Sequence, residues 1–174
     1  MENESELPGI GQLSSTPEIL RALLEDLTAE QAQWKPAADR WSIAEILEHL
    51  SHVEGNGFRA RVDAMVNEDN PHLPEYDQVA HAASGSYSGR DAEESFDHWE
   101  EQREDNVAFL DSLPAKAARR TGAHAVFGTI TLGQLLNEWA FHDLGHIRQI
   151  AEIVRTLRYY PDMGPFQKIY QVNP

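Results

Sequence analysis

The chain has 174 residues, 41% of them hydrophobic, which is enough for one globular domain with a buried core. It contains no cysteine, so disulfides, thiolate metal ligands and cysteine nucleophiles are excluded, as is common in cytoplasmic proteins. Its formal net charge is -15, from 29 acidic and 14 basic residues, and we expect such a chain to bind neither nucleic acid nor an anionic membrane.

The N-terminal residues 1–13 are interpreted as a flexible tail. They carry Glu2, Glu4 and Glu6 and contain neither a basic start nor an apolar run, so we expect no export signal and a cytoplasmic location. No later segment approaches the roughly 20 apolar residues that a membrane-spanning helix needs. Residues 14–174 are predicted to form a single domain.

Two helices are predicted in the first half of this domain. The run Thr16-Pro17-Glu18 is typical of a helix start, because a hydroxyl that can cap the first amides precedes a proline in the first turn. The run Ser42-Ile43-Ala44-Glu45 is a capping box. It predicts a second helix, whose apolar stripe continues to Met65.

Two further helices are predicted in the second half. Residues 67–86 read as a long loop, and loops of this length often cover functional sites. A third helix is expected from Ser88 to about Leu110, and a capping box at residues 131–134 opens a fourth that ends near Arg158. No segment alternates as a strand does. The pattern therefore predicts an all-α fold, an up-down-type four-helix bundle with long connecting loops and an irregular C-terminal tail.

Histidine spacing indicates a metal site inside this bundle. His142 and His146 lie four residues apart, so their rings share one face of the fourth helix, beside its apolar stripe. On the second helix, His49 lies at the edge of the apolar face, whereas His52 points away from it. We therefore predict His49, His142 and His146 as ligands, although three core histidines satisfied by hydrogen bonds would give the same pattern.

The ligand types indicate which ion such a site would hold. Three imidazoles suit one divalent ion, with zinc and nickel as the first candidates. Since no fourth protein ligand is evident, at least one coordination position would stay open to water, as in catalytic metal sites.

Asp143 is a weak candidate for a catalytic base. The run His142-Asp143-Leu144-Gly145-His146 matches the zinc-hydrolase pattern HExxH, except that Asp replaces the Glu that serves there as general base. The projection places Asp143 near the middle of the apolar stripe, where it could instead pair with an arginine or orient a histidine. Arg103 is a candidate partner for a buried acid. His72, His81 and His124 could line an opening, and His98 is expected to be exposed.

Three motifs in a fixed order carry a family resemblance. They are residues 27–36, the run WSIAEILEHL at residues 41–50, and the run from Gly128 that leads into HDLGHIRQI at residues 142–150. With these motifs the sequence resembles the DinB/YfiT-like family of metal-binding four-helix bundles over about residues 14–158. The resemblance implies metal ligands at His49, His142 and His146, nickel or zinc as the ion, and a homodimer.

Two classes of function follow from these observations. The first is a metal-dependent enzyme acting on a small molecule; the resemblance implies a transferase that uses a low-molecular-weight thiol, and a hydrolase is the second form. The alternative is a non-catalytic, metal-bound dimeric module that binds a small ligand or a partner. The sequence identifies neither the substrate nor the reaction.

Overall fold

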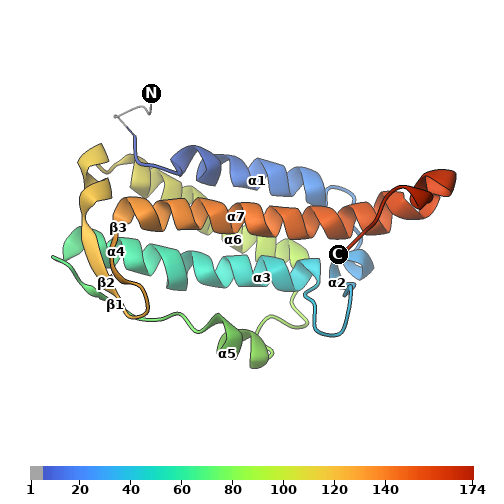
Figure 1. Ribbon diagram of the computed structural model, residues 1–174, viewed down its shortest axis with the longest axis horizontal. Helices are drawn as coiled ribbons and strands as arrows, with labels where there is room; N and C mark the ends of the chain where they lie inside the picture. Colours follow the sequence, from blue (N-terminus) through green and yellow to red (C-terminus); the bar gives the residue numbers. More distant parts are fainter. Residues whose placement is uncertain (1–5) are drawn as a thin grey trace.

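Four long helical segments lie side by side and form a bundle in the computed structural model, which describes residues 6–174 apart from the side chains of residues 78 and 79 (Figure 1). They are α1 (Ile10–Leu24), α3 (Ile43–Val53) with its continuation through η1 (Glu54–Arg59) into α4 (Ala60–Asn67), α6 (Ala92–Asp111) and α7 (Leu132–Val154). The predicted all-α four-helix bundle is confirmed. None of the described helices is both long and apolar enough to cross a membrane.

The four helices run up, down, down and up in chain order. Helix α1 is parallel to α7, because residue numbers rise together along the two helices in the contacts Thr16–Asp143 and Glu25–Arg158. In the same way α3 is parallel to α6, as in Glu48–Ser95 and Ser51–Gln102. Parallel neighbours need a long crossover, and the segment between α4 and α6 supplies one.

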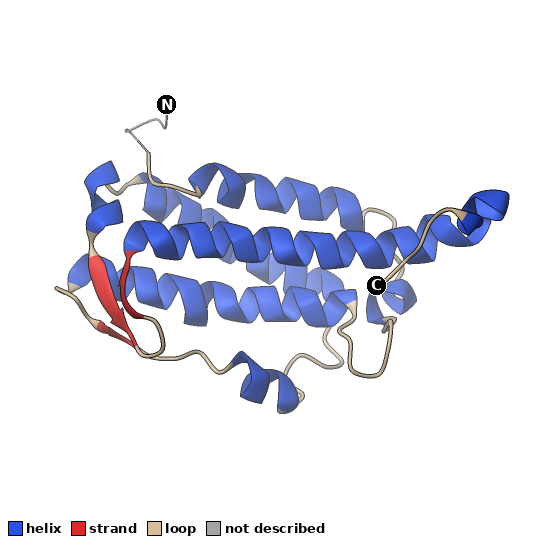
Figure 2. Cartoon of the chain, viewed as in Figure 1, coloured by secondary structure: helices blue, strands red, loops and turns tan. Residues whose placement is uncertain are grey.

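The shorter elements lie at the two ends and along one side of the bundle (Figure 2). A three-stranded sheet closes one end, with β1 parallel to β2 and β2 antiparallel to β3. These strands have only two to four residues each, too few for the sequence to show alternation. The remaining elements are α2 (Ala29–Gln33), β1 (His72–Leu73), α5 (Gln78–Ala83), η2 (Ala115–Arg119), β2 (Thr121–His124), β3 (Gly128–Thr131), η3 (Arg155–Tyr159) and η4 (Tyr160–Lys168).

The prediction of a tail up to residue 13 is wrong for the residues that the structure describes. Helix α1 begins at Ile10, and Leu7, Ile10 and Leu13 are buried. Gly9 precedes the helix with a φ of 80°, and a Cβ there would lie 2.8 Å from a backbone oxygen of α7, so glycine permits close packing. Residues 1–5 lie outside the described residues. Thr16 is not a helix cap; it lies inside α1 and is fully buried.

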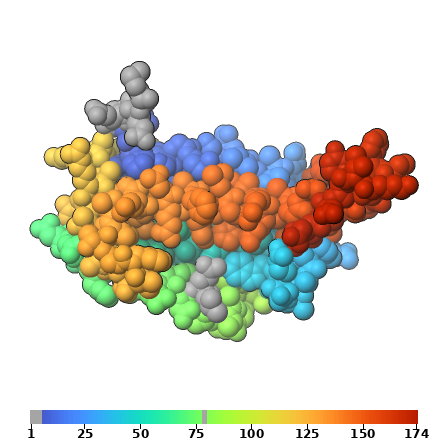
Figure 3. All heavy atoms as spheres, viewed as in Figure 1, coloured from blue at the N-terminus to red at the C-terminus, as the bar shows by residue number. Residues whose placement is uncertain are grey.

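The other helix starts follow the local sequence. Ser42 and Thr131 each accept a hydrogen bond from the backbone amide three residues on and complete capping boxes for α3 and α7, as predicted. Helix α6 begins after Asp91, whose carboxylate caps two backbone amides, so the helix starts a few residues later than predicted. The C-terminal residues extend beyond the bundle at the end of α7 (Figure 3).

The core is divided into two apolar clusters, one around Trp139 and the other around Trp99. Polar side chains from all four long helices lie near the point where each helix passes from one cluster to the other. We call them the polar layer; its members are Thr16, His49, Glu54, Arg103, Asn106, His142, Asp143 and His146, and all are buried except His142, which is half-buried. Buried polar groups destabilise a fold unless they find partners, so this layer is where function is to be sought.

Candidate metal centre

The three predicted histidines meet in the polar layer. The Nε2 atom of His142 lies 3.1 Å from Nε2 of His49 and 3.1 Å from Nε2 of His146. One nitrogen from each ring can be chosen so that all three lie within 4.8 Å of one another. His49 comes from α3, and His142 and His146 come from successive turns of α7. The structure thus brings together the histidines that spacing and helical projection selected.

Two of these rings are held from behind through their Nδ1 atoms. Nδ1 of His49 lies 3.2 Å from the hydroxyl of Tyr87, a buried residue of the crossover segment. Nδ1 of His146 lies 2.8 Å from Oε1 of Gln149, to which it can only donate. Its Nε2 is therefore an unprotonated lone pair that faces the other rings. Partners of this kind orient histidine ligands in metal sites.

Burial keeps all three imidazoles neutral. It lowers the pKa of His49 to about 2, with further lowering by His146 and His142. It lowers the pKa of His142 to about 3, helped by His146 and Arg103. Burial also lowers the pKa of His146, although its bond to Gln149 acts in the opposite direction. Neutral imidazole is the form that binds metal.

The donor set fits a divalent cation better than it fits protons alone. Three ring nitrogens converge through two contacts that share Nε2 of His142, and Nε2 of His146 carries no proton. At most one of the two contacts can therefore be a hydrogen bond. Nδ1 of His142 is also buried and has no hydrogen-bond partner among the described residues. A cation among the Nε2 atoms would satisfy all three lone pairs at once, and imidazole nitrogens suit zinc and nickel.

An ion-pair network fills the rest of the polar layer. Arg103 donates to both oxygens of Glu54, at 2.7 and 2.8 Å, and to both oxygens of Asp143, at 2.6 and 3.1 Å. Trp99, Trp139 and Asn106 also donate to Glu54. Burial alone would lower the pKa of Arg103, but the two carboxylates raise it above its ordinary value.

A proline in α1 contributes to this network. Pro17 has no backbone N–H, so it cannot donate to the carbonyl of Leu13, four residues earlier. That carbonyl accepts a hydrogen bond from Nη1 of Arg103 instead, at 3.1 Å. The proline that reads as a helix start in the sequence therefore leaves an acceptor for the buried arginine.

Asp143 lies in the network and not among the imidazoles. One of its oxygens accepts from Thr16 at 2.8 Å, and both accept from Arg103. Burial raises the pKa of Asp143, against the lowering effect of Arg103. The pairing with an arginine, considered from the sequence, is thus observed, and these contacts leave the carboxylate without a free face for proton transfer. The role of Asp143 as a base stays a weak prediction.

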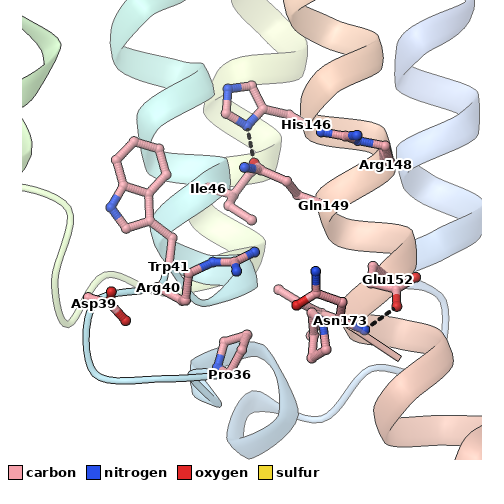
Figure 4. A pocket seen from close by; sticks show the side chains of 12 residues that line it. Pro36, Asp39, Arg40, Trp41, Ile46, His146, Arg148, Gln149, Glu152 and Asn173 are labelled. Atoms are coloured by element: carbon pink, nitrogen blue, oxygen red, sulfur yellow. Dashed lines mark hydrogen bonds between the residues drawn. The ribbon is translucent and has the colours of Figure 1, made fainter. Parts of the chain in front are cut away.

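A pocket of about 600 Å³ adjoins the histidine cluster, and His146 forms part of its wall (Figure 4). The ring of Trp41 lies parallel to that of His146, with centroids 6.4 Å apart, and 5.0 Å from His49. Gln149 lines the same pocket. The lining comes from the loop before α3, from α3, from α7 and from the last residues of the described chain.

The remaining histidines lie outside the cluster. His52 stacks on His81 with ring centroids 3.8 Å apart, at the edge of the crossover segment. Nδ1 of His124 accepts from the backbone amides of residues 126 and 127 and so caps the turn between β2 and β3. His72 and His98 are exposed, as predicted for His98.

Sequence reasoning missed Tyr87, Gln149 and Glu54. Tyr87 stands in a segment without helical periodicity, so nothing local placed it against α3. Gln149 follows His146 by three residues, a spacing that could have identified it. Glu54 lies in the π-helical turn η1, which shifts the helical projection by one residue and hides a buried acid among polar neighbours.

The fold and the site define a four-helix bundle with a three-histidine cluster between α3 and α7. The family model of the DinB superfamily matches residues 12–150, and the chain belongs to this superfamily.

Relatives and a solved structure agree with that assignment. The chain is 23% identical over 146 residues to the Oceanobacillus iheyensis protein named "Putative metal-dependent hydrolase OB0782", with 84% of each chain covered. It is 28% identical over 148 residues to YuaE of Bacillus subtilis, covering 75% of this chain and 87% of YuaE. The solved structure of YfiT from Bacillus subtilis is similar with a TM-score of 0.76, at 23% identity over 85% of each chain. It is described as a probable metal-dependent hydrolase with an unusual four-helix bundle topology.

Proposed function

We propose that the protein binds one divalent metal ion, zinc or nickel, through His49, His142 and His146, and that it is an enzyme acting on a small molecule. The observation that carries the proposal is the convergence of three Nε2 atoms, with 3.1 Å between His142 and each of the other two. When bound, such an ion lowers the pKa of a coordinated water or thiol and polarises a substrate oxygen.

The surrounding residues have separate tasks in this proposal. Tyr87 and Gln149 orient the rings of His49 and His146 so that their lone pairs face the ion. Phe58 packs edge-on against His142, with centroids 5.4 Å apart, and keeps that side dry. The pocket beside Trp41 holds the substrate next to His146.

Hydrolysis is the reaction that the comparisons favour, since the name of one relative and the description of YfiT both give metal-dependent hydrolase. The second form is a transferase with a low-molecular-weight thiol as co-substrate, which rests on the family resemblance of the sequence. Both use the same ion and pocket. They differ in whether water or a thiol is the nucleophile, so substrate panels distinguish them.

Metal content tests the first half of the proposal. Protein purified without a chelator or a histidine tag should contain one zinc or nickel ion per chain by elemental analysis. His49→Ala should lose that ion, whereas His98→Ala, which removes an exposed histidine of α6, should keep it. Equal metal content in the two variants would contradict the proposed ligand set.

Turnover tests the second half. Metal-loaded protein is assayed against esters, amides and phosphoesters, and against electrophiles with a panel of low-molecular-weight thiols. We expect turnover that is lost in His49→Ala and retained in His98→Ala. Stoichiometric metal with the same background rate in both variants would instead favour the non-catalytic binding module.

The homodimer is a further part of the proposal. Phe141 and Leu144 lie on the outer face of α7, with 78% and 48% of their surfaces exposed, and two copies could bury them against each other. Sedimentation equilibrium should give twice the 19.6 kDa chain mass. The double variant Phe141→Ser, Leu144→Ser should shift the protein toward the monomer; a monomeric native protein would contradict the dimer.

A further inference from the structure

We propose that the pocket beside His146 binds a carboxylate, or a similarly charged anionic group, through Arg40 and Arg148, and that its ligand joins this group to an apolar part. The inference rests on the proposed function, because it takes this pocket to be the substrate site. It adds the charge and the shape of the molecule that the pocket accepts.

Arg40 and Arg148 line the pocket without an acidic partner. Within residues 6–174, neither guanidinium has an Asp, Glu or terminal carboxylate oxygen within 4.0 Å, and neither donates a side-chain hydrogen bond. Seven other basic residues do have an acidic partner at that distance: Arg21, Lys35, Arg59, Arg90, Arg103, Arg120 and Arg155. Although the chain has 29 acidic residues, both guanidinium groups at this pocket are thus available to a ligand.

The lining has fewer uncompensated acidic side chains than guanidinium groups. Glu152 accepts from Nη1 of Arg155 at 3.0 Å and from the backbone N–H of Asn173 at 2.8 Å, so its own charge is already compensated. Asp39 is the other acid of the lining. Among the side chains of the lining, two guanidinium groups are thus accompanied by one carboxylate that has no cationic partner among the described residues.

The two arginines come from opposite walls. Arg40 belongs to the loop before α3 and Arg148 to α7, two residues after His146, as Figure 4 shows. A guanidinium group pairs with a carboxylate through two parallel hydrogen bonds, so either arginine offers such a group a binding position at this pocket. The long-range field of the chain repels anions, so selection for an anion must come from these two side chains.

Apolar side chains complete the pocket. Trp41, Ile46 and Ile153 line it, and the volume of about 600 Å³ is within the range of small-molecule sites. The indole of Trp41 lies parallel to His146, so an apolar part of the ligand that stacks on Trp41 would lie next to the histidine cluster. The lining thus matches an aromatic or branched aliphatic carboxylate.

Binding of three matched probes tests the proposal. The probes are 2-naphthoate, 2-naphthylmethanol and 2-naphthylmethylammonium, which share one ring system and differ in charge. Affinity is measured by calorimetry on protein stripped of metal with a chelator, so that no probe can bind through an ion. We expect naphthoate to bind about tenfold more tightly than the alcohol, with the ammonium probe weakest, and the preference to fall with added salt.

Two double variants test whether the preference for naphthoate depends on Arg40 and Arg148. Arg40→Gln with Arg148→Gln should abolish the preference for naphthoate. Lys116→Gln with Arg119→Gln, which removes two exposed charges of η2 away from the pocket, changes the net charge equally and should leave the preference intact. Circular dichroism melting establishes that each variant is folded.

Equal affinity for naphthoate and the alcohol, no measurable binding of naphthoate, or a preference that survives in the Arg40, Arg148 variant would each overturn the proposal. These results concern metal-free protein. They are therefore distinct from a failure of the proposed function, which would be seen as absent metal or absent turnover.

Discussion

The two parts of the polar layer share α7 and the long helix formed by α3 and η1, but they satisfy their polar groups in different ways. In the ionic part, Arg103 donates to both oxygens of Glu54 and of Asp143, and tryptophan and asparagine donors complete the contacts of Glu54. In the histidine part, neutral rings point their Nε2 atoms at one another, and Nδ1 of His142 has no partner among the described residues.

This difference indicates that the ionic part supports the fold, whereas the histidine part is available to bind a cation. A fully bonded buried network holds α1, α3, α6 and α7 at fixed distances, which it can do without any ligand. The incompletely bonded cluster is held in place by that network and gains partners only when a cation enters. Substitutions on the two sides should therefore affect stability and metal binding unequally.

The largest effect is expected from Arg103→Met. It leaves the carboxylates of Glu54 and Asp143 buried without their cation, which should lower the free energy of unfolding by about 3–5 kcal/mol in urea denaturation. Arg155→Met breaks a half-exposed pair with Glu152 and should cost no more than about 1 kcal/mol. Similar losses in the two variants would show that the network is not the support.

Acid should destabilise the metal-free protein through the histidine part. Unfolded histidine takes up a proton below its pKa of 6.5, whereas His49 and His142, with pKa values of about 2 and about 3, stay neutral in the fold. Stability is therefore present above pH 6.5 and is lost as the pH falls from 6.5 toward 3. Between pH 7 and pH 5 the loss should be about 2 kcal/mol for each ring.

Comparison with His49→Gln, His142→Gln isolates this contribution. The double variant lacks both titrations. Between pH 7 and pH 5 its loss of unfolding free energy should therefore be smaller than that of the native protein by about 4 kcal/mol. Chelator-treated samples of both proteins are compared by urea denaturation. Parallel pH profiles would contradict the assignment of buried, neutral histidines.

Asp143→Asn tests whether Asp143 stabilises the fold or acts as the catalytic base. The variant keeps the shape of the side chain but removes the charge that pairs with Arg103, and we expect a loss of stability of about 1.5–3 kcal/mol. Metal content should stay at one ion per chain. Asp97→Asn, on an exposed position of α6, is the matched control. Native stability with abolished turnover would revive Asp143 as the catalytic base.

Tyr87→Phe should have the smallest effect, and on metal binding alone. It removes the oxygen next to Nδ1 of His49, so metal affinity measured by chelator competition should fall about 10- to 100-fold. Tyr76→Phe removes only the second hydroxyl, 3.3 Å from that of Tyr87, and should weaken binding less. Unchanged affinity in Tyr87→Phe would mean that packing alone orients His49.

The sequence predicts those parts of the molecule that repeat at helical spacing. Capping boxes at Ser42 and Thr131 locate two helix starts, and projection on those helices selects His49 over His52 because a ligand must share the buried face. The same projection puts Asp143 in the core and suggests Arg103 as a partner. These inferences need only the geometry of a single helix.

The rest depends on contacts between segments far apart in sequence. Tyr87 reaches His49 because the crossover returns along α3, and no local pattern encodes that path. The early start of α1 was hidden because Gly9 offers no capping side chain, whereas Pro17, inside the helix, resembles a start. Its missing N–H is accommodated by Arg103, which lies 86 positions further along the chain and cannot be found from α1 alone.

The π-helical turn at Glu54–Arg59 makes the fold sensitive to the deletion of a residue within it. One surplus residue there rotates everything before it by about 100° relative to everything after it, compared with an uninterrupted α-helix. Deleting the exposed Asn56 would make this segment a continuous α-helix. Either His49 would then turn away from α7 or Met65 would leave the core. The π-helical turn thus sets which face each half of this long helix turns toward the core.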